Sequence, residues 1–219
     1  MKKLSQDEYL VKRHRAEVVE ADGFGDKVLY LPDGTYFKLF RRKRLISYSL
    51  VFPYAKQFAL NALKLKKLGI PTVTVIDVYR IPSVQRTAVH YDALEGCILS
   101  SLSCKFDEDL MFKFGDFIRH LHDNGVYFRS LHFSNVVLTP ENNIGIIDIA
   151  DIYFKEFLTR SLSLRLRVRN FKHIFRYAED QRILSERLEA FEKGYESRGQ
   201  SVVTRQILEN MCMKDFKSR

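Results

Sequence analysis

Two residues whose side chains carry oxygen, Asn135 and Asp148, flank a predicted hairpin in the second half of the chain. Residues 136–138 and 144–147 are apolar and rich in β-branched side chains, and the polar run 139–143 between them is typical of a turn. Antiparallel strands joined this way bring Asn135 and Asp148 together at the open end. An amide oxygen beside a carboxylate could bind Mg²⁺, which prefers oxygen ligands and substrate phosphates. An ordinary hairpin with a polar rim would have the same sequence, so this segment leaves both readings open.

A helix that positions this hairpin is predicted over residues 107–124. Acidic residues fill its first turn, and Gly125 stands where it should stop. Its apolar positions recur at helical spacing and define one buried face. They are Leu110, Phe114, Phe117, Ile118 and Leu121.

Strands dominate the first ninety residues. Residues 17–20, 27–31, 35–40, 73–79 and 88–91 are β-rich, and a turn over 32–34 that contains glycine predicts a hairpin. Residues 56–68 have helical spacing and end before Gly69-Ile70-Pro71. Residues 92–105 are expected to connect, and helices to follow from about residue 153. We therefore predict an α+β fold of two lobes, a β-rich one over 1–91 and a mainly helical one over 92–219.

The composition is that of a folded protein of 219 residues, 46% of them hydrophobic, with a formal net charge of +9. Such a basic excess indicates an anionic partner such as nucleotide, acidic lipid, phosphorylated glycan or nucleic acid. Dense basic runs occur at 41–44 and 165–176. In the second run, Arg165, Arg167 and Arg169 alternate with apolar residues. These charges would share one face of a strand but spread around a helix, and either run could equally be a solvated surface.

The cysteine and hydropathy patterns indicate in which cellular compartment the protein is expected. Cys97, Cys104 and Cys212 form no metal-ligand spacing, which favours a reduced cytosolic protein without a structural zinc or disulfide framework. The start of the chain has no apolar core typical of a signal peptide, and the longest mostly apolar stretch, 45–55, is about half of a membrane span. We expect a cytoplasmic protein, peripheral to a membrane at most.

Residues 128–148 carry a family resemblance. The run Phe128-Arg129-Ser130-Leu131, followed by Asn135, aligns without a gap with the kinase motif H-R-D-L-x-x-x-N. The fuller pattern from Gly125 to Asp151 resembles lipopolysaccharide core kinases and antibiotic phosphotransferases. More narrowly, residues 21–27, 38–44 and 128–132 resemble small bacterial proteins of the toluene-tolerance or lipopolysaccharide-kinase-like type. The resemblance covers residues 18–177 and implies a protein-kinase-like fold.

The resemblance also assigns binding roles residue by residue. Lys38 matches the strand lysine that pairs with ATP phosphates, and Asn135 and Asp148 match the Mg²⁺ ligands. Gly23 and Gly25 match part of the glycine-rich phosphate loop, although the third glycine is absent. Without the resemblance, Lys38 could be an edge lysine and Gly23–Gly25 a plain turn.

Three positions depart from the kinase pattern. Ser130 replaces the aspartate that accepts the substrate proton, with Asp151 as the nearest substitute and His132 as a substrate contact or a structural histidine. No Asp or Glu occurs between residues 45 and 68, so the acidic partner of the strand lysine is missing, with Gln57 or Asn61 as weak stand-ins. Tyr36 stands where kinases keep a small residue above the adenine.

These observations lead to one main expectation and two alternatives. We expect an ATP- and Mg²⁺-dependent kinase that phosphorylates a sugar hydroxyl of the lipopolysaccharide inner core at the cytoplasmic membrane face. The first alternative is a non-catalytic pseudokinase that binds nucleotide or a partner in envelope biogenesis, which Ser130 favours. The second, nucleic-acid binding, depends on charge alone, because the sequence has no zinc finger, RRM core or KH-type loop.

Overall fold

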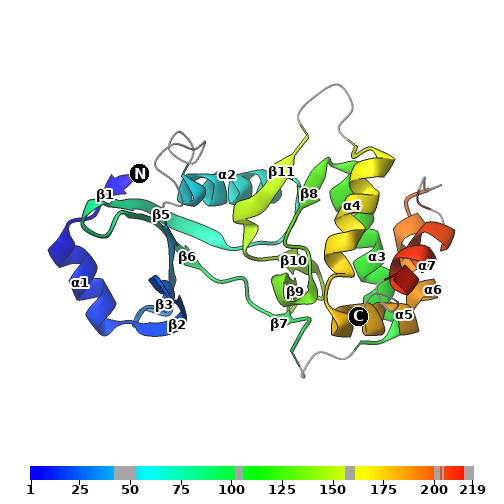
Figure 1. Ribbon diagram of the computed structural model, residues 1–219, viewed down its shortest axis with the longest axis horizontal. Coiled ribbons are helices and arrows are strands. Elements are labelled where there is room, and N and C mark those ends of the chain that lie inside the picture. Colours follow the sequence, from blue (N-terminus) through cyan, green and yellow to red (C-terminus); the bar gives the residue numbers. More distant parts are fainter. Residues whose placement is uncertain (42–52, 102–105, 156–160, 200–202, 204, 215–219) are drawn as a thin grey trace. The chain divides into compact units, whose positions relative to one another are not determined.

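The computed structural model describes residues 1–41, 53–101, 106–155, 161–199, 203 and 205–214. These form a mixed α and β protein with a six-stranded mixed sheet, two smaller sheets and seven α-helices in the described ranges (Figure 1). This content agrees with the predicted α+β class. The chain divides into two compact units. The first unit holds Met1–Leu94 and Asp148–Asp151, and the second holds Glu95–Ile147 and Ile152–Arg219.

The first unit is built on the six-stranded sheet. Its strand order is β1-β5-β6-β4-β3-β2; β1 pairs with β5 in parallel, and the other pairs are antiparallel. The hairpin predicted around residues 32–34 is β3–β4, with Leu29 opposite Phe37. The strands are β1 (Lys2–Lys3), β2 (Glu17–Asp22), β3 (Gly25–Tyr30), β4 (Tyr36–Arg41), β5 (Thr74–Ile81) and β6 (Arg86–Asp92).

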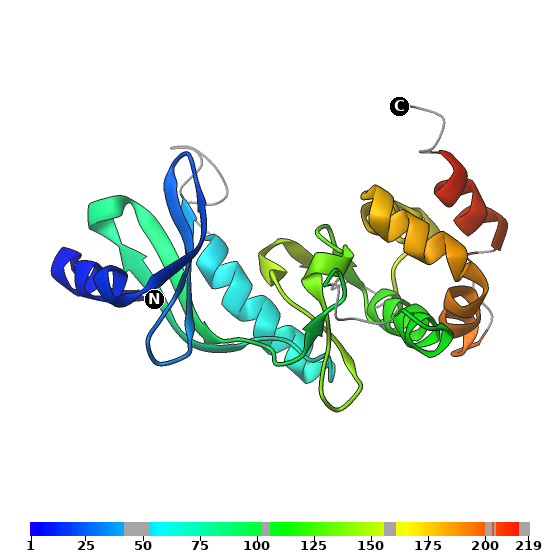
Figure 2. The same ribbon diagram turned by 90° about the horizontal axis from the view of Figure 1, so that it is seen from below.

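A helix covers each face of this sheet. Helix α1 (Gln6–Arg15) packs through Tyr9 on a core that includes Leu29, Phe37 and Leu39. Helix α2 (Tyr54–Lys67) packs through Phe58 on the opposite face, where its ring meets Phe40 and Tyr91. Figure 2 shows α1 and α2 on the two sides of the sheet. Side chains alternate along a strand, so Phe37 and Leu39 of β4 face α1. Tyr36, Lys38 and Phe40 face α2.

Helix α2 confirms the helix predicted over 56–68, and the left-handed Gly69, with φ of 70°, follows its end. Helix α1 was not predicted. It begins with a capping box in which the Ser5 hydroxyl accepts from the Glu8 amide while the Glu8 carboxylate accepts from the Ser5 amide. The basic run 42–44 and the apolar stretch 45–52 lie outside the described residues.

The second unit is helical around two small sheets. Helix α3 confirms the helix predicted over 107–124, with Asp107 as its N-cap. The predicted hairpin is β9–β10, and β7, which the sequence analysis placed in a connector, adds to it. The elements of this unit and the turn η4 of the first unit are β7 (Cys97–Ile98), α3 (Glu108–Asp123), β8 (Val126–Phe128), η3 (Phe133–Asn135), β9 (Val136–Leu138), β10 (Ile144–Ile146), η4 (Ile149–Asp151), β11 (Ile152–Phe154), α4 (Leu164–Ile174), α5 (Ala178–Glu186), α6 (Leu188–Glu196) and α7 (Arg205–Lys214).

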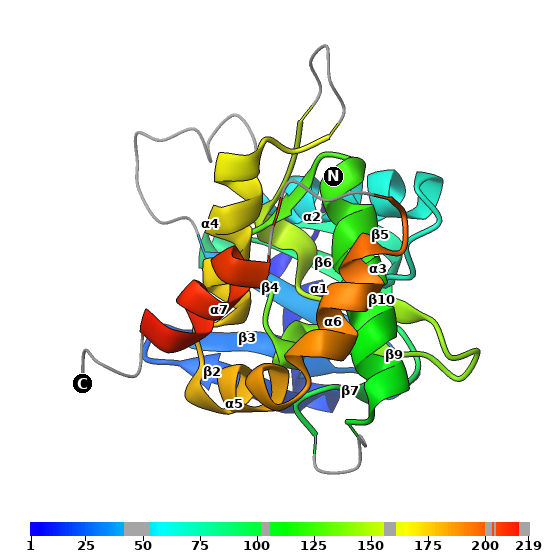
Figure 3. The same cartoon turned by 90° about the vertical axis from the view of Figure 1, so that its right-hand side faces the viewer.

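The core of this helical unit lies around α3 and α6, which lie side by side in Figure 3, and Phe171 of α4 packs against Phe191 and Tyr195 of α6. Two glycines permit the close approach of α3 and α6. A Cβ atom built at Gly115 would overlap the Phe191 carbonyl, and one built at Gly194 would overlap the Phe112 carbonyl. A buried polar network adjoins this contact. Arg167 donates to Asp123 and to the Tyr195 hydroxyl, and His122 lies 2.8 Å from that hydroxyl.

Among the described residues, no helix combines the length and apolar character that crossing a bilayer requires.

Candidate functional site

Lys38 is the strongest candidate for a functional side chain in the first unit. It lies on the α2-facing side of β4, and only 14% of its side chain is exposed. A largely buried ammonium needs a partner, because desolvating an unpaired charge is costly. Its Nζ donates to Oδ1 of Asp148 at 2.6 Å. The structure therefore brings together the two residues that the sequence assigned to phosphate and metal binding.

The backbone holds Asp148 in an uncommon conformation. Its φ is 52°, in the left-handed region that costs a residue with a side chain free energy of order 1 kcal/mol. Such strain persists only where the surroundings fix it. The turn η4, which follows directly, is fixed by α2, since Nδ2 of the buried Asn61 donates to the Ile149 carbonyl at 2.6 Å. Asn61 thus positions the segment after Asp148, which differs from the predicted role as a stand-in partner of Lys38.

Aromatic rings line the same face of the sheet. Tyr36 stacks on Tyr91 with ring centroids 5.8 Å apart and also meets Tyr30 at 5.1 Å. Burial raises the pKa of Tyr91, and the charge of Asp148 raises it further, so Tyr91 stays neutral beside the carboxylate. The side chain expected to crowd or stack on an adenine is therefore packed against the sheet's own aromatic residues.

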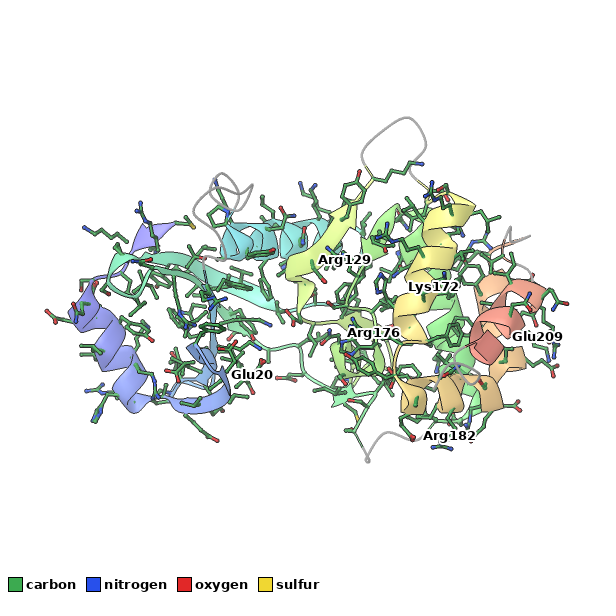
Figure 4. The ribbon with its side chains drawn as sticks, in the orientation of Figure 1. Glu20, Arg129, Lys172, Arg176, Arg182 and Glu209 are labelled. Atoms are coloured by element: carbon green, nitrogen blue, oxygen red, sulfur yellow. The ribbon has the colours of Figure 1, made fainter. Side chains whose placement is uncertain are left out.

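A second ion pair, between Lys27 and Glu20, joins the strands β2 and β3. Its hydrogen bond to Glu20 raises the pKa of Lys27, with smaller contributions from the charges of Glu20, Asp22 and Asp148. Lys27 and Glu20 therefore extend the charged group around Asp148 (Glu20 is labelled in Figure 4). The sequence analysis gave neither residue a role, and the bulge in β2 at Glu20 changes the facing that simple alternation predicts for this strand.

The predicted phosphate loop is the tight turn between β2 and β3. Gly25 has a φ of 102°, which favours glycine, while nothing crowds Gly23. The Phe24 amide donates to Oδ1 of Asp22 at 2.8 Å, and the Arg86 guanidinium donates to the Phe24 carbonyl. These contacts hold the turn without a ligand, so its phosphate-binding role stays a prediction.

Residues 128–135, which align with the kinase motif, lie in the second unit, and hydrogen bonds within this loop fix its conformation. The Ser130 carbonyl accepts from the His132 amide at 3.1 Å and from Nδ2 of Asn135 at 2.9 Å. The Asn135 carbonyl accepts from the Ile147 amide at 3.0 Å, which ties this loop to the strand that precedes Asp148. His132 packs edge-on against Tyr177, with centroids 5.0 Å apart, as expected for a structural histidine.

Asp180 supports this loop and was not predicted. It is buried in the first turn of α5 and accepts from the Phe133 amide at 2.9 Å. Burial raises the pKa of its carboxyl, while the Phe133 amide and the nearby His132 oppose that shift. The only signal in the sequence was its place among acidic residues at a helix start, which also suits an ordinary exposed position.

A cavity of about 860 Å³ lies beside the loop within the second unit. His132 and Ser134 line it from the loop and Tyr177 from the start of α5. Arg182, labelled in Figure 4, also lines it and is held by Glu179 and Glu186. Hydroxyl, aromatic and balanced charged groups of this kind can bind a polar organic molecule.

The residues present fit Mg²⁺ only as part of a larger complex. Within the described ranges, no group of three or more His, Cys, Asp and Glu side chains is placed to hold a metal ion. Mg²⁺ is commonly held by one or two protein oxygens together with substrate phosphates and water. Asp148, with its side chain 45% exposed, can supply one such oxygen. Asn135 belongs to the other unit and stays a predicted ligand from the sequence pattern.

The predicted site residues thus fall into two groups. Lys38, Asp148 and Asp151, the last residue of η4, belong to the first unit with the turn at Gly23 and Gly25. The second unit holds the remaining three, which are Ser130, His132 and Asn135.

No protein-family model matches the chain, and no curated protein matches it.

Proposed function

We propose that this protein is an ATP- and Mg²⁺-dependent phosphotransferase of protein-kinase-like fold. Its proposed acceptor is a sugar hydroxyl of the lipopolysaccharide inner core, at the cytoplasmic face of the membrane. The observation that carries the proposal is the ion pair between Lys38 and Asp148, 110 positions apart in sequence and 2.6 Å apart in space.

This pair offers the two charges that a nucleotide triphosphate with its metal requires. An ammonium pairs with phosphate oxygens, and a carboxylate binds the cation that accompanies them. Phosphoryl transfer depends mainly on such positioning and electrostatic stabilisation, with little covalent chemistry left to the protein. Bound Mg²⁺ would supply neutralisation of the phosphate charge, with Asp148 as its carboxylate ligand.

The conformation around Asp148 also favours a functional role. A residue held in a left-handed conformation by a buried amide from another element resembles the strained positions that cluster at active sites. A merely structural ion pair would need neither the strained backbone nor the bond between Asn61 and the Ile149 carbonyl.

The alternative proposal is a pseudokinase that binds nucleotide without transferring phosphate. Ser130 favours it, because a hydroxyl is a far weaker proton acceptor than a carboxylate. General-base assistance is worth roughly 10²–10⁴-fold, so its loss predicts slow transfer or none. Asp151, beyond the strained Asp148, remains the proposed substitute base.

The test is transfer of labelled phosphate from ATP to purified lipopolysaccharide core acceptor. We expect transfer by the natural protein and a loss of at least about 10²-fold in Asp148→Asn. Asp77→Asn removes a comparable carboxylate that pairs with Lys2 at the far edge of the sheet, and it should keep nearly full activity.

Two other results would change the assignment. Stabilisation by MgATP without any transfer would assign the pseudokinase role. The enzyme proposal would be lost if intact acceptor received no phosphate and Asp148→Asn left the cellular glycan unchanged.

A further inference from the structure

One face of α4 carries a row of basic side chains. Arg165, Arg169, Lys172 and Arg176 are spaced by four, three and four residues, which aligns them on one side of the helix. All four are exposed, and Arg176 lies just past the C-cap. Because the segment is helical, the charges were expected to spread around it. Instead, Arg167 faces the core, and the other four share the solvent side.

Arg129 extends this basic row from the neighbouring loop. His173 lies between the two segments, with Nε2 3.0 Å from the Tyr127 hydroxyl. Nδ2 of Asn170 on α4 donates to the Phe128 carbonyl at 2.6 Å, which holds the segment next to Arg129 against this helix. Burial lowers the pKa of His173, and the charges of Arg129, Arg169 and Arg176 lower it further. Figure 4 shows Lys172 on α4, Arg176 near the end of this helix and Arg129 near β11. We call the five residues Arg129, Arg165, Arg169, Lys172 and Arg176 the basic face.

Among the described residues, the basic face has no carboxylate partner. None of its five members forms a salt bridge with a carboxylate in the described part of the chain. Eight other arginines and lysines of the second unit form one within the described residues. Five positive charges without partners repel one another, which destabilises the folded state. An external anion would reduce that repulsion.

Exposed apolar side chains border the basic face. Leu164 is 41% exposed at the start of α4, and Tyr177 is 48% exposed just after Arg176. Tyr153 is 56% exposed on β11, directly opposite Tyr127 in the strand pair. Basic side chains flanked by leucine and tyrosine are typical of surfaces that rest on a bilayer, where apolar groups enter the headgroup boundary and charges meet acidic lipids.

We propose that the basic face docks the second unit on an anionic lipid bilayer. From Arg165 on α4 to Arg176 just past its C-cap, the basic face is roughly 17 Å long at the helical rise, enough to contact several headgroups at once. Tyr177 lines the cavity of about 860 Å³, so docking brings one wall of that cavity to the membrane surface. This inference stands without the proposed phosphotransfer, since it depends only on charge and exposure.

The test is binding of the full-length protein to phosphatidylcholine vesicles with and without phosphatidylglycerol. We expect binding only to the acidic vesicles, weakened by added salt. Arg169→Gln with Lys172→Gln should weaken it about thirtyfold, and Arg165→Gln with Arg176→Gln similarly. All four side chains are exposed and their mutual repulsion is reduced in these variants, so the melting temperature should not fall below that of the natural protein.

A charge-matched control separates local docking from net charge. Lys113→Gln with Lys193→Gln removes the same charge from α3 and α6 and should weaken binding less than about threefold. Equal binding to neutral and acidic vesicles, or an equal loss in the control, would overturn the proposal. Binding of single-stranded RNA that the Arg169 and Lys172 substitutions abolish, without vesicle binding, would assign the basic face to nucleic acid instead.

Discussion

The ammonium of Lys38 lies 2.6 Å from Oδ1 of Asp148, and the two partners differ in access to solvent. The lysine side chain is 14% exposed and the aspartate side chain 45%. In the proposed nucleotide site, the more exposed carboxylate would be the first group that a cation meets, and a phosphate oxygen would become the partner of Lys38. Opening the ion pair would leave the largely buried ammonium unpaired, which is costly, so a phosphate oxygen must replace the carboxylate as the pair opens.

Ser130→Asp restores the carboxylate that the kinase pattern has at this position. If only the proton acceptor is missing, transfer should increase by about 10²–10⁴-fold. The measurement is the initial rate of phosphate transfer to core acceptor. Ser83→Asp, which adds the same charge at an exposed turn of the first unit, should leave the rate unchanged. A Ser130→Asp protein that binds MgATP but transfers no faster would show that more than the base is lost.

Asn61→Leu removes the amide that fixes the turn after Asp148. The Ile149 carbonyl would be left without this donor in a buried place, which should lower the free energy of unfolding by about 1–3 kcal/mol. Urea denaturation measures this, and MgATP affinity should fall in parallel. Gln57→Leu, one turn earlier and only partly buried, is the control and should cost less than half as much. If Asn61→Leu and Gln57→Leu lowered the unfolding free energy and the MgATP affinity equally, the hydrogen bond from Asn61 to the Ile149 carbonyl would not be what fixes the turn.

Gly115→Ala tests the close packing of α3 and α6. Alanine favours a helix by about 1 kcal/mol over glycine, but its Cβ would overlap the Phe191 carbonyl. The overlap should win and destabilise the protein by more than about 2 kcal/mol. Gly194→Ala should behave alike. Gly23→Ala has no atom within 4 Å of the new Cβ and should change the unfolding free energy by less than about 0.5 kcal/mol.

Buried histidine makes stability depend on pH. Burial, with the charge of Arg167, lowers the pKa of His122 to about 3. In the unfolded chain the His122 ring becomes protonated below about pH 6.5, whereas in the folded protein it stays neutral until about pH 3. The contribution of His122 to the free energy of unfolding is therefore fully present above about pH 6.5 and is lost as the pH falls toward 3. At pH 5 the loss from His122 should be about 2 kcal/mol.

Urea denaturation at pH 7.5 and pH 5 measures this loss, which should shrink in His122→Gln. His90 and His173, whose pKa burial also lowers, contribute in the same direction and remain in the variant. Independently of any variant, the His122 ring should show no titration between about pH 5 and 8 by NMR. A His122 resonance that titrates near 6.5 would contradict the buried network.

Local patterns predicted much of the fold. The helix at 107–124, α2, and the hairpins β3–β4 and β9–β10 follow from periodicity and turn residues. Helix α1 was missed because a polar helix with one buried side chain, Tyr9, shows little periodicity, although the capping box from Ser5 to Glu8 was a usable signal. Strand β7 is two residues long and exists only through its pairing with β9, which no local pattern contains.

The candidate site was predictable where a motif fixes a residue. Lys38 and Asp148 came from the kinase-like pattern, and the structure pairs them. The role of Asp180 was not predictable, because it depends on a hydrogen bond from the Phe133 amide, 47 positions away in the sequence. The alternating Arg and Leu of 164–169 left strand and helix open, and packing of the buried Phe171 and Arg167 decides for the helix.

The most direct test of the account is calorimetric titration of MgATP into the natural protein, Lys38→Met and Lys2→Met. Lys2 also pairs with an aspartate, but in an exposed position, so it is the matched control. We predict saturable 1:1 binding to the natural protein and to Lys2→Met, and a loss of at least about tenfold in affinity for Lys38→Met. No MgATP binding by the folded natural protein, or equal affinity in Lys38→Met, would contradict the assignment of Lys38 and Asp148 to a nucleotide site.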